Sequence, residues 1–183
     1  MLCYFTYYLL YKTLVNKIKV SINNISKNAL IYEKVILGVE NELTKFTRFI
    51  NHGFADTNSI KSETLIYDVC GMAIYQIENR YKNNLPLLLI IGWKVYSMPF
   101  NTKENKWFVS IGCRPDLNFP DKKSINKYLE ENGNFGSNTK IFEDYSIAID
   151  VLMNSGNNAK LNINIRDIHV SRSYFGIIKK YIS

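Results

Sequence analysis

The chain has 183 residues, of which 46% are hydrophobic and 21% are charged, so its composition excludes an intrinsically disordered protein. A net charge of +7 permits an anionic partner such as nucleic acid, lipid or an acidic protein, but no dense basic run requires one. The three cysteines, Cys3, Cys70 and Cys113, are odd in number and far apart, which excludes a disulfide framework and favours a reducing compartment. We therefore expect one globular, cytoplasmic domain over residues 1–183.

The first residues are apolar and rich in tyrosine. The apolar run ends at Tyr11 and is followed by Lys12, Lys17 and Lys19, so it is shorter than the roughly 20 residues of a membrane-spanning helix. A signal peptide would carry its positive charge before the apolar run and end in small residues, and this segment does neither. It predicts a buried terminal element of the fold and no transmembrane segment, with a membrane-surface or partner-binding segment as the alternative.

The next elements follow from the spacing of apolar residues. Alternation at Ile18, Val20 and Ile22 predicts a half-buried strand. Spacings of three and four residues then predict an amphipathic helix over about 26–53, and a second one over about 59–81. The apolar positions of the first helix are Ile31, Val35, Val39, Leu43, Phe46 and Ile50.

The second half of the chain begins with two apolar strands around a short polar loop, which predict a long antiparallel hairpin over residues 87–113. Helices are expected over 124–131 and 139–154, and a last strand over 160–171, with a bulge near Arg166-Asp167 where the alternation slips. A short helix over 174–182 follows.

The resulting order β-α-α-β-β-α-α-β-α predicts an α+β fold. This fold would contain an antiparallel sheet of about four strands that packs against several helices. The sheet would include the hairpin over 87–113 and the last strand over 160–171.

The chain lacks the motifs of common active sites. No zinc-ligand pair and no glycine-rich phosphate loop occur, so we expect no metal and no cofactor. A nucleophilic set could be drawn from Cys113, His169 and either Asp167 or Asp116. Cys113 continues the apolar face of its strand, however, which favours a structural thiol.

Polar residues of catalytic type concentrate in residues 166–174. Metal-free ribonucleases use histidine, arginine and tyrosine or serine together to activate a 2′-hydroxyl and neutralise the phosphate. The candidate catalytic residues are His169, Arg166, Arg172, Ser171 and Tyr174. The set lacks a second general acid or base, so the polar face of a sheet is the simpler interpretation.

Aromatic residues crowd the central hairpin at Trp93, Tyr96, Trp107 and Phe108. Such residues stack on nucleic-acid bases, anchor protein interfaces or fill a core, and the sequence does not separate these three interpretations.

These observations lean away from an enzyme and towards a protein-binding module. We expect an inhibitor or an immunity or antitoxin-type protein that occludes the surface of a toxin or effector with an acidic patch. The expected partner-binding residues are Arg114, Phe119, Lys122, Lys123, Arg166, Arg172 and Tyr174. The alternative is a basic nucleic-acid-binding protein, or a metal-free ribonuclease that uses the cluster from Arg166 to Tyr174.

Overall fold

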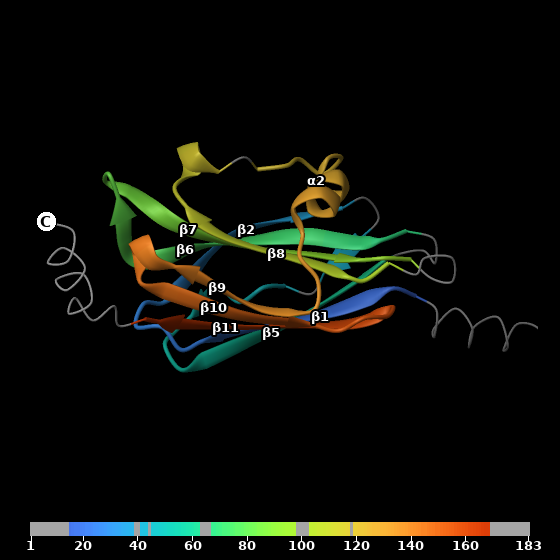
Figure 1. Cartoon of the computed structure of the whole chain (residues 1–183), viewed down its shortest axis with the longest axis horizontal. Helices are drawn as coiled ribbons and strands as arrows, with labels where there is room; N and C mark the ends of the chain where they lie inside the picture. Colours follow the sequence, from blue (N-terminus) through green and yellow to red (C-terminus); the bar gives the residue numbers. More distant parts are fainter. Residues whose placement is uncertain are drawn as a thin grey trace, which may run out of the picture.

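Two β-sheets pack face to face in the computed structural model, which describes residues 15–38, 41–43, 45–62, 67–97, 103–117 and 119–168 (Figure 1). The first sheet has the strand order β3-β5-β1-β11-β10-β9, and its neighbours are antiparallel except for the parallel pair β1 and β11. Its strands are β1 (Lys17–Asn24), β3 (Asn41–Leu43), β5 (Phe54–Ser62), β9 (Ser137–Phe142), β10 (Ile147–Met153) and β11 (Asn158–Asp167).

The second sheet has the order β4-β2-β6-β7-β8 and is antiparallel throughout. Its strands are β2 (Leu30–Leu37), β4 (Phe49–Ile50), β6 (Val69–Lys82), β7 (Leu85–Val95) and β8 (Lys106–Gly112). The α-helix α2 (Ile125–Asn132) lies over the outer face of this sheet (Figure 1), and two short 3-10 turns, η1 (Arg114–Asp116) and η2 (Glu143–Tyr145), complete the described part of the chain.

The main core lies between the two sheets. Strands β1 and β11 alternate between inward apolar and outward polar residues, as expected for a sheet with one face in water. The five-stranded sheet contributes an aromatic group, in which the Phe46 ring lies 5.8 Å from Tyr32 and 6.2 Å from Trp93. A second, smaller core lies under α2, where Ile125 and Leu129 pack on residues such as Met72.

The expected α+β fold is wrong, because the described residues form a β-sandwich of eleven strands. Residues 26–53 contain β2, β3 and β4 in place of a helix, residues 59–81 belong mostly to β5 and β6, and residues 139–154 contain β9, η2 and β10. The sheets therefore contain six and five strands in place of about four.

The misleading spacing has physical causes. A register shift between Tyr32 and Lys34 interrupts the alternation of β2, so its apolar residues fall at helix-like intervals. Strand β6 is covered by the opposite sheet on one face and by α2 on the other, so seven of its residues in succession, from Val69 to Tyr75, are buried without alternation.

Other expectations are confirmed. The strand over 18–22 lies within β1, the hairpin over 87–113 is formed by β7 and β8, and the helix over 124–131 corresponds to α2. The last strand is β11, but its pairing with β10 runs without a shift to Asp167, so no bulge occurs there. The expected helix over 174–182 and the tyrosine-rich start before residue 15 lie outside the described residues.

Candidate functional site

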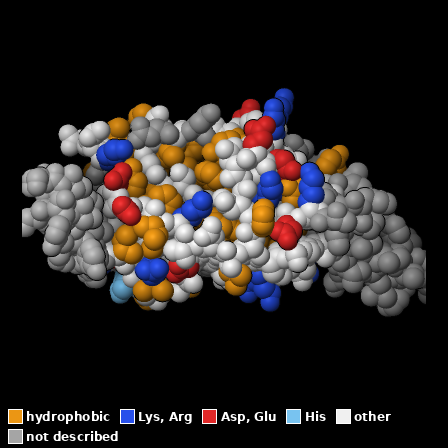
Figure 2. Space-filling view, viewed as in Figure 1, with side chains coloured by type: hydrophobic (Ala, Val, Ile, Leu, Met, Phe, Trp, Pro, Cys, Tyr) orange, Lys and Arg blue, Asp and Glu red, His pale blue; other side chains and the backbone are white. Residues whose placement is uncertain are grey.

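One end of the sandwich exposes an unusual number of large apolar side chains. This apical end consists of the β1–β2 loop (residues 25–29), the β4–β5 turn (51–53) and the β6–β7 turn (83–84) with their flanking residues. Its exposed apolar residues, with their exposed fractions, are Ile25 (48%), Phe49 (46%), Phe54 (66%), Tyr81 (60%) and Leu85 (42%). In Figure 2, hydrophobic side chains gather at the left-hand end of the molecule beside basic and acidic ones.

The β1–β2 loop is held by the fully buried amide of Asn24. Its Nδ2 donates to the backbone oxygens of Asn28, at 2.9 Å, and Ile50, at 2.8 Å. Its Oδ1 accepts from the backbone N–H and the hydroxyl of Ser26. A single side chain therefore joins the loop to β4 with every polar atom of the amide satisfied, which leaves the loop little freedom to move.

Two further contacts fix the same loop. The carboxylate of Asp167, at the end of β11, accepts from the backbone N–H of Lys27 at 2.7 Å and pairs with Arg80 at 3.2 Å. The ring of His52 lies with Nδ1 2.9 Å from the backbone oxygen of Ser26. The loop backbone is thus turned inwards, and the side chains of Ile25 and Lys27 are left exposed.

The β6–β7 turn projects from the same end (Figure 1). Asn83 and Asn84 both have positive φ, at 53° and 62°, which matches the turn type that suits a tight two-residue hairpin. This turn holds Tyr81 and Leu85 on its flanks, and the pair between Arg80 and Asp167 ties its base to the β1–β2 loop.

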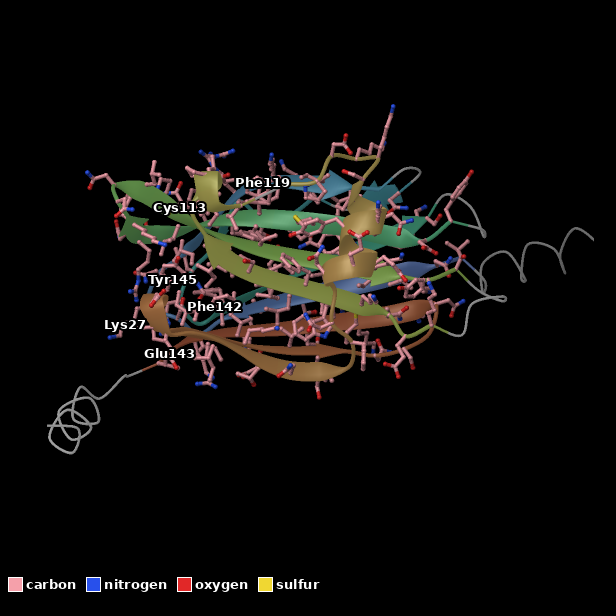
Figure 3. The ribbon with its side chains drawn as sticks, turned by 45° about the horizontal axis from the view of Figure 1, so that its top comes forward. Lys27, Cys113, Phe119, Phe142, Glu143 and Tyr145 are labelled. Carbon is pink, nitrogen blue, oxygen red and sulfur yellow. The ribbon has the colours of Figure 1, made fainter. Side chains whose placement is uncertain are left out.

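Basic side chains accompany the apolar ones. The guanidinium of Arg48 lies 5.3 Å from the ring centroid of Phe49, and the ammonium of Lys82 lies 6.0 Å from that of Tyr145. Figure 3 places Lys27 at the same end of the molecule as Glu143 and Tyr145. The apical end therefore combines exposed aromatic rings with cations on a backbone that is already ordered.

The sequence prediction did not single out Phe49 and Phe54, because a helix was expected over about 26–53 and Phe54 fell between that helix and the next one. A usable signal was present, since the two rings flank Asn51-His52-Gly53, and Gly53 has a φ of 77° that favours glycine. The turn between β4 and β5 leaves both rings exposed.

The structure does not bring the described members of the predicted partner-binding set together, and Arg172 and Tyr174 lie outside the described residues. Arg114 pairs with Glu33 at 2.7 Å, and Phe119 is half-buried under Lys34, both on the side of the five-stranded sheet. Lys122 and Lys123 are exposed in the segment before α2, also on that side. Arg166 lies on the outer face of the six-stranded sheet, where it pairs with Asp150, so it belongs to the opposite face of the sandwich.

The predicted catalytic residues His169, Ser171, Arg172 and Tyr174 lie outside the described residues. Arg166 is the described member of that cluster, and its contact with Asp150, at 3.1 Å, is an ion pair on the sheet surface.

The predicted nucleophilic set has little support among the described residues. Cys113 is buried, with Sγ facing the backbone oxygens of Lys82 and Leu85, and Asp167 is engaged by Lys27 and Arg80. Cys113 is therefore a core thiol.

The aromatic residues of the central hairpin are mainly core residues. Trp93 and Trp107 are fully buried and paired across β7 and β8, Tyr96 is buried, and Phe108 packs edge-on against Tyr128 of α2. In the described part of the chain they offer no stacking surface, and no group of histidine, cysteine or carboxylate side chains there could hold a metal ion.

A cluster of ionisable groups lies under α2. Glu130 accepts from the ammonium of Lys94 at 2.6 Å, from that of Lys103 at 2.8 Å and from the hydroxyl of Tyr96. These three donors, Lys103 first, lower the pKa of Glu130 to about 2, while burial and the bond to Glu130 raise the pKa of Tyr96. Asp68 adds a second carboxylate 3.7 Å from Lys94, so the cluster neutralises its own charges and ties α2 to β7.

Comparisons with known proteins agree with the β-sandwich. No family model and no curated protein matches the chain. Among solved structures, the lipid-binding protein Nakanori matches with a TM-score of 0.64 at 12% identity, over 82% of this chain and 70% of that one. The Xerocomus chrysenteron lectin XCL, as wild type and as a methionine-substituted variant, matches with a TM-score of 0.55 at 8% identity, over 82% of this chain and 99% and 97% of theirs. At these identities the likeness establishes the fold alone. No helix of the described residues is long and apolar enough to cross a membrane.

Proposed function

We propose that this chain is a non-enzymatic binding protein that docks on the surface of an anionic lipid bilayer through its apical end. The observation that carries the proposal is the set of exposed apolar side chains, with Phe54 the most exposed, at an end where hydrogen bonds from Asn24 and Asp167 hold the β1–β2 loop in place. Exposed apolar patches next to polar residues mark sites of contact with proteins, ligands or membranes. Because the loops are ordered beforehand, docking would cost little conformational entropy.

The chemistry of the apical end suits a bilayer interface. Aromatic side chains are favoured at the level of the lipid headgroups, and basic side chains are attracted to anionic lipids. Arg48 lies beside the exposed ring of Phe49, and Lys27 is exposed on the same end, so both would meet lipid phosphates while Phe49 and Phe54 enter the acyl boundary. A protein partner would fit the apolar residues equally well, but a bilayer also accounts for their spread over three separate turns.

The likeness in fold supports the proposal without establishing it. One matching structure is described as a lipid-binding protein and another as a lectin, so both are named for binding. Neither is an immunity protein, and the immunity and antitoxin interpretation is not carried further. The expectation of a chain that acts by binding remains a prediction.

The contribution of the exposed rings to the free energy of docking on a bilayer can be estimated from their exposed fractions. Full burial of a large apolar side chain is worth about 1.5–3 kcal/mol, and roughly half of each Phe ring is still exposed. Phe49 and Phe54 together should therefore contribute about 2 kcal/mol to docking, which corresponds to about thirtyfold in the partition coefficient.

The test is co-sedimentation of the full chain with vesicles of phosphatidylcholine alone and of phosphatidylcholine with 30% phosphatidylserine. We expect binding to the anionic vesicles, and a loss of about thirtyfold in the variant Phe49→Ser/Phe54→Ser. The matched control is Phe135→Ser/Leu152→Ser, which removes two equally exposed apolar side chains, at 64% and 52%, away from the apical end. The proposal fails if wild type does not bind either vesicle, or if the control variant loses as much binding as the apical one.

A further inference from the structure

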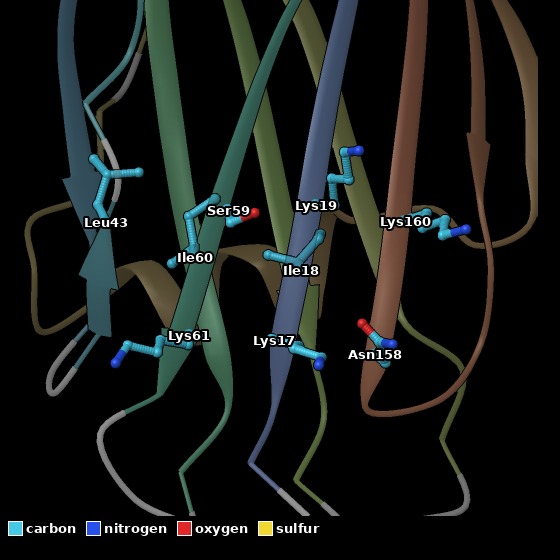
Figure 4. A pocket seen from close by; sticks show the side chains of 9 residues that line it. All are labelled: Lys17, Ile18, Lys19, Leu43, Ser59, Ile60, Lys61, Asn158 and Lys160. Carbon is cyan, nitrogen blue, oxygen red and sulfur yellow. The ribbon is translucent and has the colours of Figure 1, made fainter. Parts of the chain in front are cut away.

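Four lysines form a continuous chain on the outer face of the six-stranded sheet. Lys17 and Lys19 face outwards from β1, Lys61 from β5 and Lys160 from β11. The strand register pairs Lys17 with Lys61 and Lys19 with Lys160. Figure 4 shows all four side chains on these three adjacent strands.

This arrangement works against stability. Like charges directly opposite each other on neighbouring strands are unfavourable, and here two such pairs share one strand. The register also pairs Lys61 with Glu42 of the edge strand β3. No acidic residue stands at the outward positions between Lys17, Lys19 and Lys160. An anion bound to this surface would reduce the repulsion between the lysines and so stabilise the folded protein.

The lysines also enclose a shallow groove. It has a volume of about 410 Å³, and its lining includes the four lysines with Ser59 and Asn158. This volume lies within the roughly 300–1,000 Å³ of small-molecule sites. The methylene stems of the lysines form apolar walls, so a ligand here meets apolar contacts at the sides and cations at the rim.

The same face continues beyond the lysines as a polar surface. The next outward positions are Ser21 on β1, Thr57 on β5, and Asn162 and Asn164 on β11. A second groove of about 370 Å³ lies there, over β9, β10 and β11. Asn162, Asn164 and Thr139 line part of it, together with Asp150, which pairs with Arg166, and the exposed Leu152. These amides and hydroxyls both donate and accept hydrogen bonds, as a chain of sugar hydroxyls requires.

We propose that the outer face of the six-stranded sheet binds a sulfated polysaccharide, with sulfate groups on Lys17, Lys19, Lys61 and Lys160 and sugar hydroxyls on the neighbouring Ser, Thr and Asn side chains. This inference does not rest on the proposed membrane docking. Lys17 and Lys19 lie at the start of β1, and the apical end follows its last residue, Asn24, which is about 23 Å from Lys17 and about 17 Å from Lys19 at 3.3 Å per residue. A lipid headgroup in a bilayer bound at the apical end would therefore not reach this groove.

The face fits a polysaccharide better than a single-stranded nucleic acid. Proteins that hold single strands stack bases on aromatic rings. Among the described residues, the outward positions of the six-stranded sheet hold no aromatic side chain. The cations and the polar side chains supply contacts for charge and hydroxyl groups, and nothing here supplies stacking.

The experiment compares dextran sulfate, unmodified dextran and poly(U) RNA as ligands of the full chain, by fluorescence titration at several salt concentrations. We expect binding to dextran sulfate that weakens steeply with salt, because each neutralised sulfate releases a counterion, and no binding to unmodified dextran. In the variant Lys17→Gln/Lys19→Gln/Lys160→Gln we expect at least tenfold weaker binding and a shallower salt dependence. The matched control is Lys122→Gln/Lys123→Gln/Lys127→Gln, which removes the same charge from exposed positions near α2 and should bind as wild type does.

A second measurement separates loss of binding from loss of folding. Because the groove variant removes both like-charge pairs, it should unfold at an equal or higher urea concentration than wild type while it binds less. The inference is overturned if the two variants lose affinity equally, since net charge alone would then explain binding. It is also overturned if poly(U) binds more tightly than dextran sulfate, or if the groove variant is destabilised. Its failure leaves vesicle binding by the apical variants unaffected, so the two proposals are tested separately.

Discussion

Removal of the Glu130 carboxylate should destabilise the fold, because this group joins α2 to β7 through three donors. A pKa lowered from 4.5 to about 2 corresponds to at most about 3.4 kcal/mol, at 1.36 kcal/mol per pKa unit. One third of the side chain is exposed, so solvent screening reduces this to about 2 kcal/mol. We therefore expect Glu130→Gln to lower the free energy of unfolding at pH 7 by about 2 kcal/mol, measured by urea titration.

The same carboxylate predicts the acid response of the fold. Because the folded-state pKa lies below the unfolded one, its contribution is present in full above about pH 5 and is lost as the pH falls towards 2. Wild type should lose that stability between pH 5 and pH 2, whereas Glu130→Gln, which has no proton to gain at this position, should show a flatter profile. Urea titrations at pH 7, 5, 4 and 3 measure both curves.

The neighbouring residue supplies the control for this prediction. Glu131 is more exposed and has only a 3.8 Å pair with Lys127 one turn earlier in α2, so Glu131→Gln should cost less than about 0.5 kcal/mol. Equal losses for Glu130→Gln and Glu131→Gln at pH 7 would refute the reasoning. So would parallel pH profiles for wild type and Glu130→Gln.

Two further predictions concern the order of the apical loop and the core thiols. Asn24→Ala removes the amide donor to the buried backbone oxygen of Ile50 and one of the two side-chain donors to that of Asn28, so it should lower the free energy of unfolding by about 2–4 kcal/mol in urea titration. A cost below about 0.5 kcal/mol would show that water replaces the amide. Cys70 is buried, and burial is the main reason why its pKa is raised to about 11. At pH 8 the native thiol should therefore react with a maleimide at least about a hundredfold more slowly than in urea, with labelling of each cysteine peptide measured by mass spectrometry. Cys113 is equally buried and should behave likewise, and fast native labelling of either thiol would contradict its placement in the core.

The sequence predicted strands where one face is apolar and the other polar, and failed where that contrast is missing. Strand β1 was found because Ile18, Val20 and Ile22 alternate with polar residues. Strand β5 was missed because its inward positions include Asp56 and Asn58, two buried polar residues that bond to each other and, through Asp56, to Thr47. Polar side chains at inward positions interrupt the alternation of apolar residues by which a strand is recognised in the sequence. They can be buried because tertiary hydrogen bonds satisfy their polar atoms.

The strand β10 shows a different failure. Its inward residues Ile147, Ile149, Val151 and Met153 alternate clearly, but Ala148 and Leu152 stand between them and also favour a helix. The β-branched residues were the better guide, since they favour strands. The pairing with β9 and β11 decides the outcome, and no local pattern contains it.

The candidate sites could be predicted less well than the strands. The expected surface joined Arg114 and Arg166, and these residues lie on opposite faces of the sandwich because the chain crosses between the two sheets after β8. The four lysines of the groove come from three strands far apart in sequence, so their adjacency follows only from the register of β1 with β5 and β11.

In each strand of the six-stranded sheet, the inward residues stabilise the fold and the outward residues are available for binding. Inward residues such as Val20 and Leu161 are fully buried, and together with the backbone ladder they determine the fold. Outward residues such as Lys19 and Lys160 contribute little to that core and are free to meet a ligand. The exposed side chains of the β1–β2 loop have the same freedom, because Asn24 holds the loop backbone from inside. The lysine groove and the apical end, about 17–23 Å apart along β1, can therefore bind different ligands without a change in the core between them.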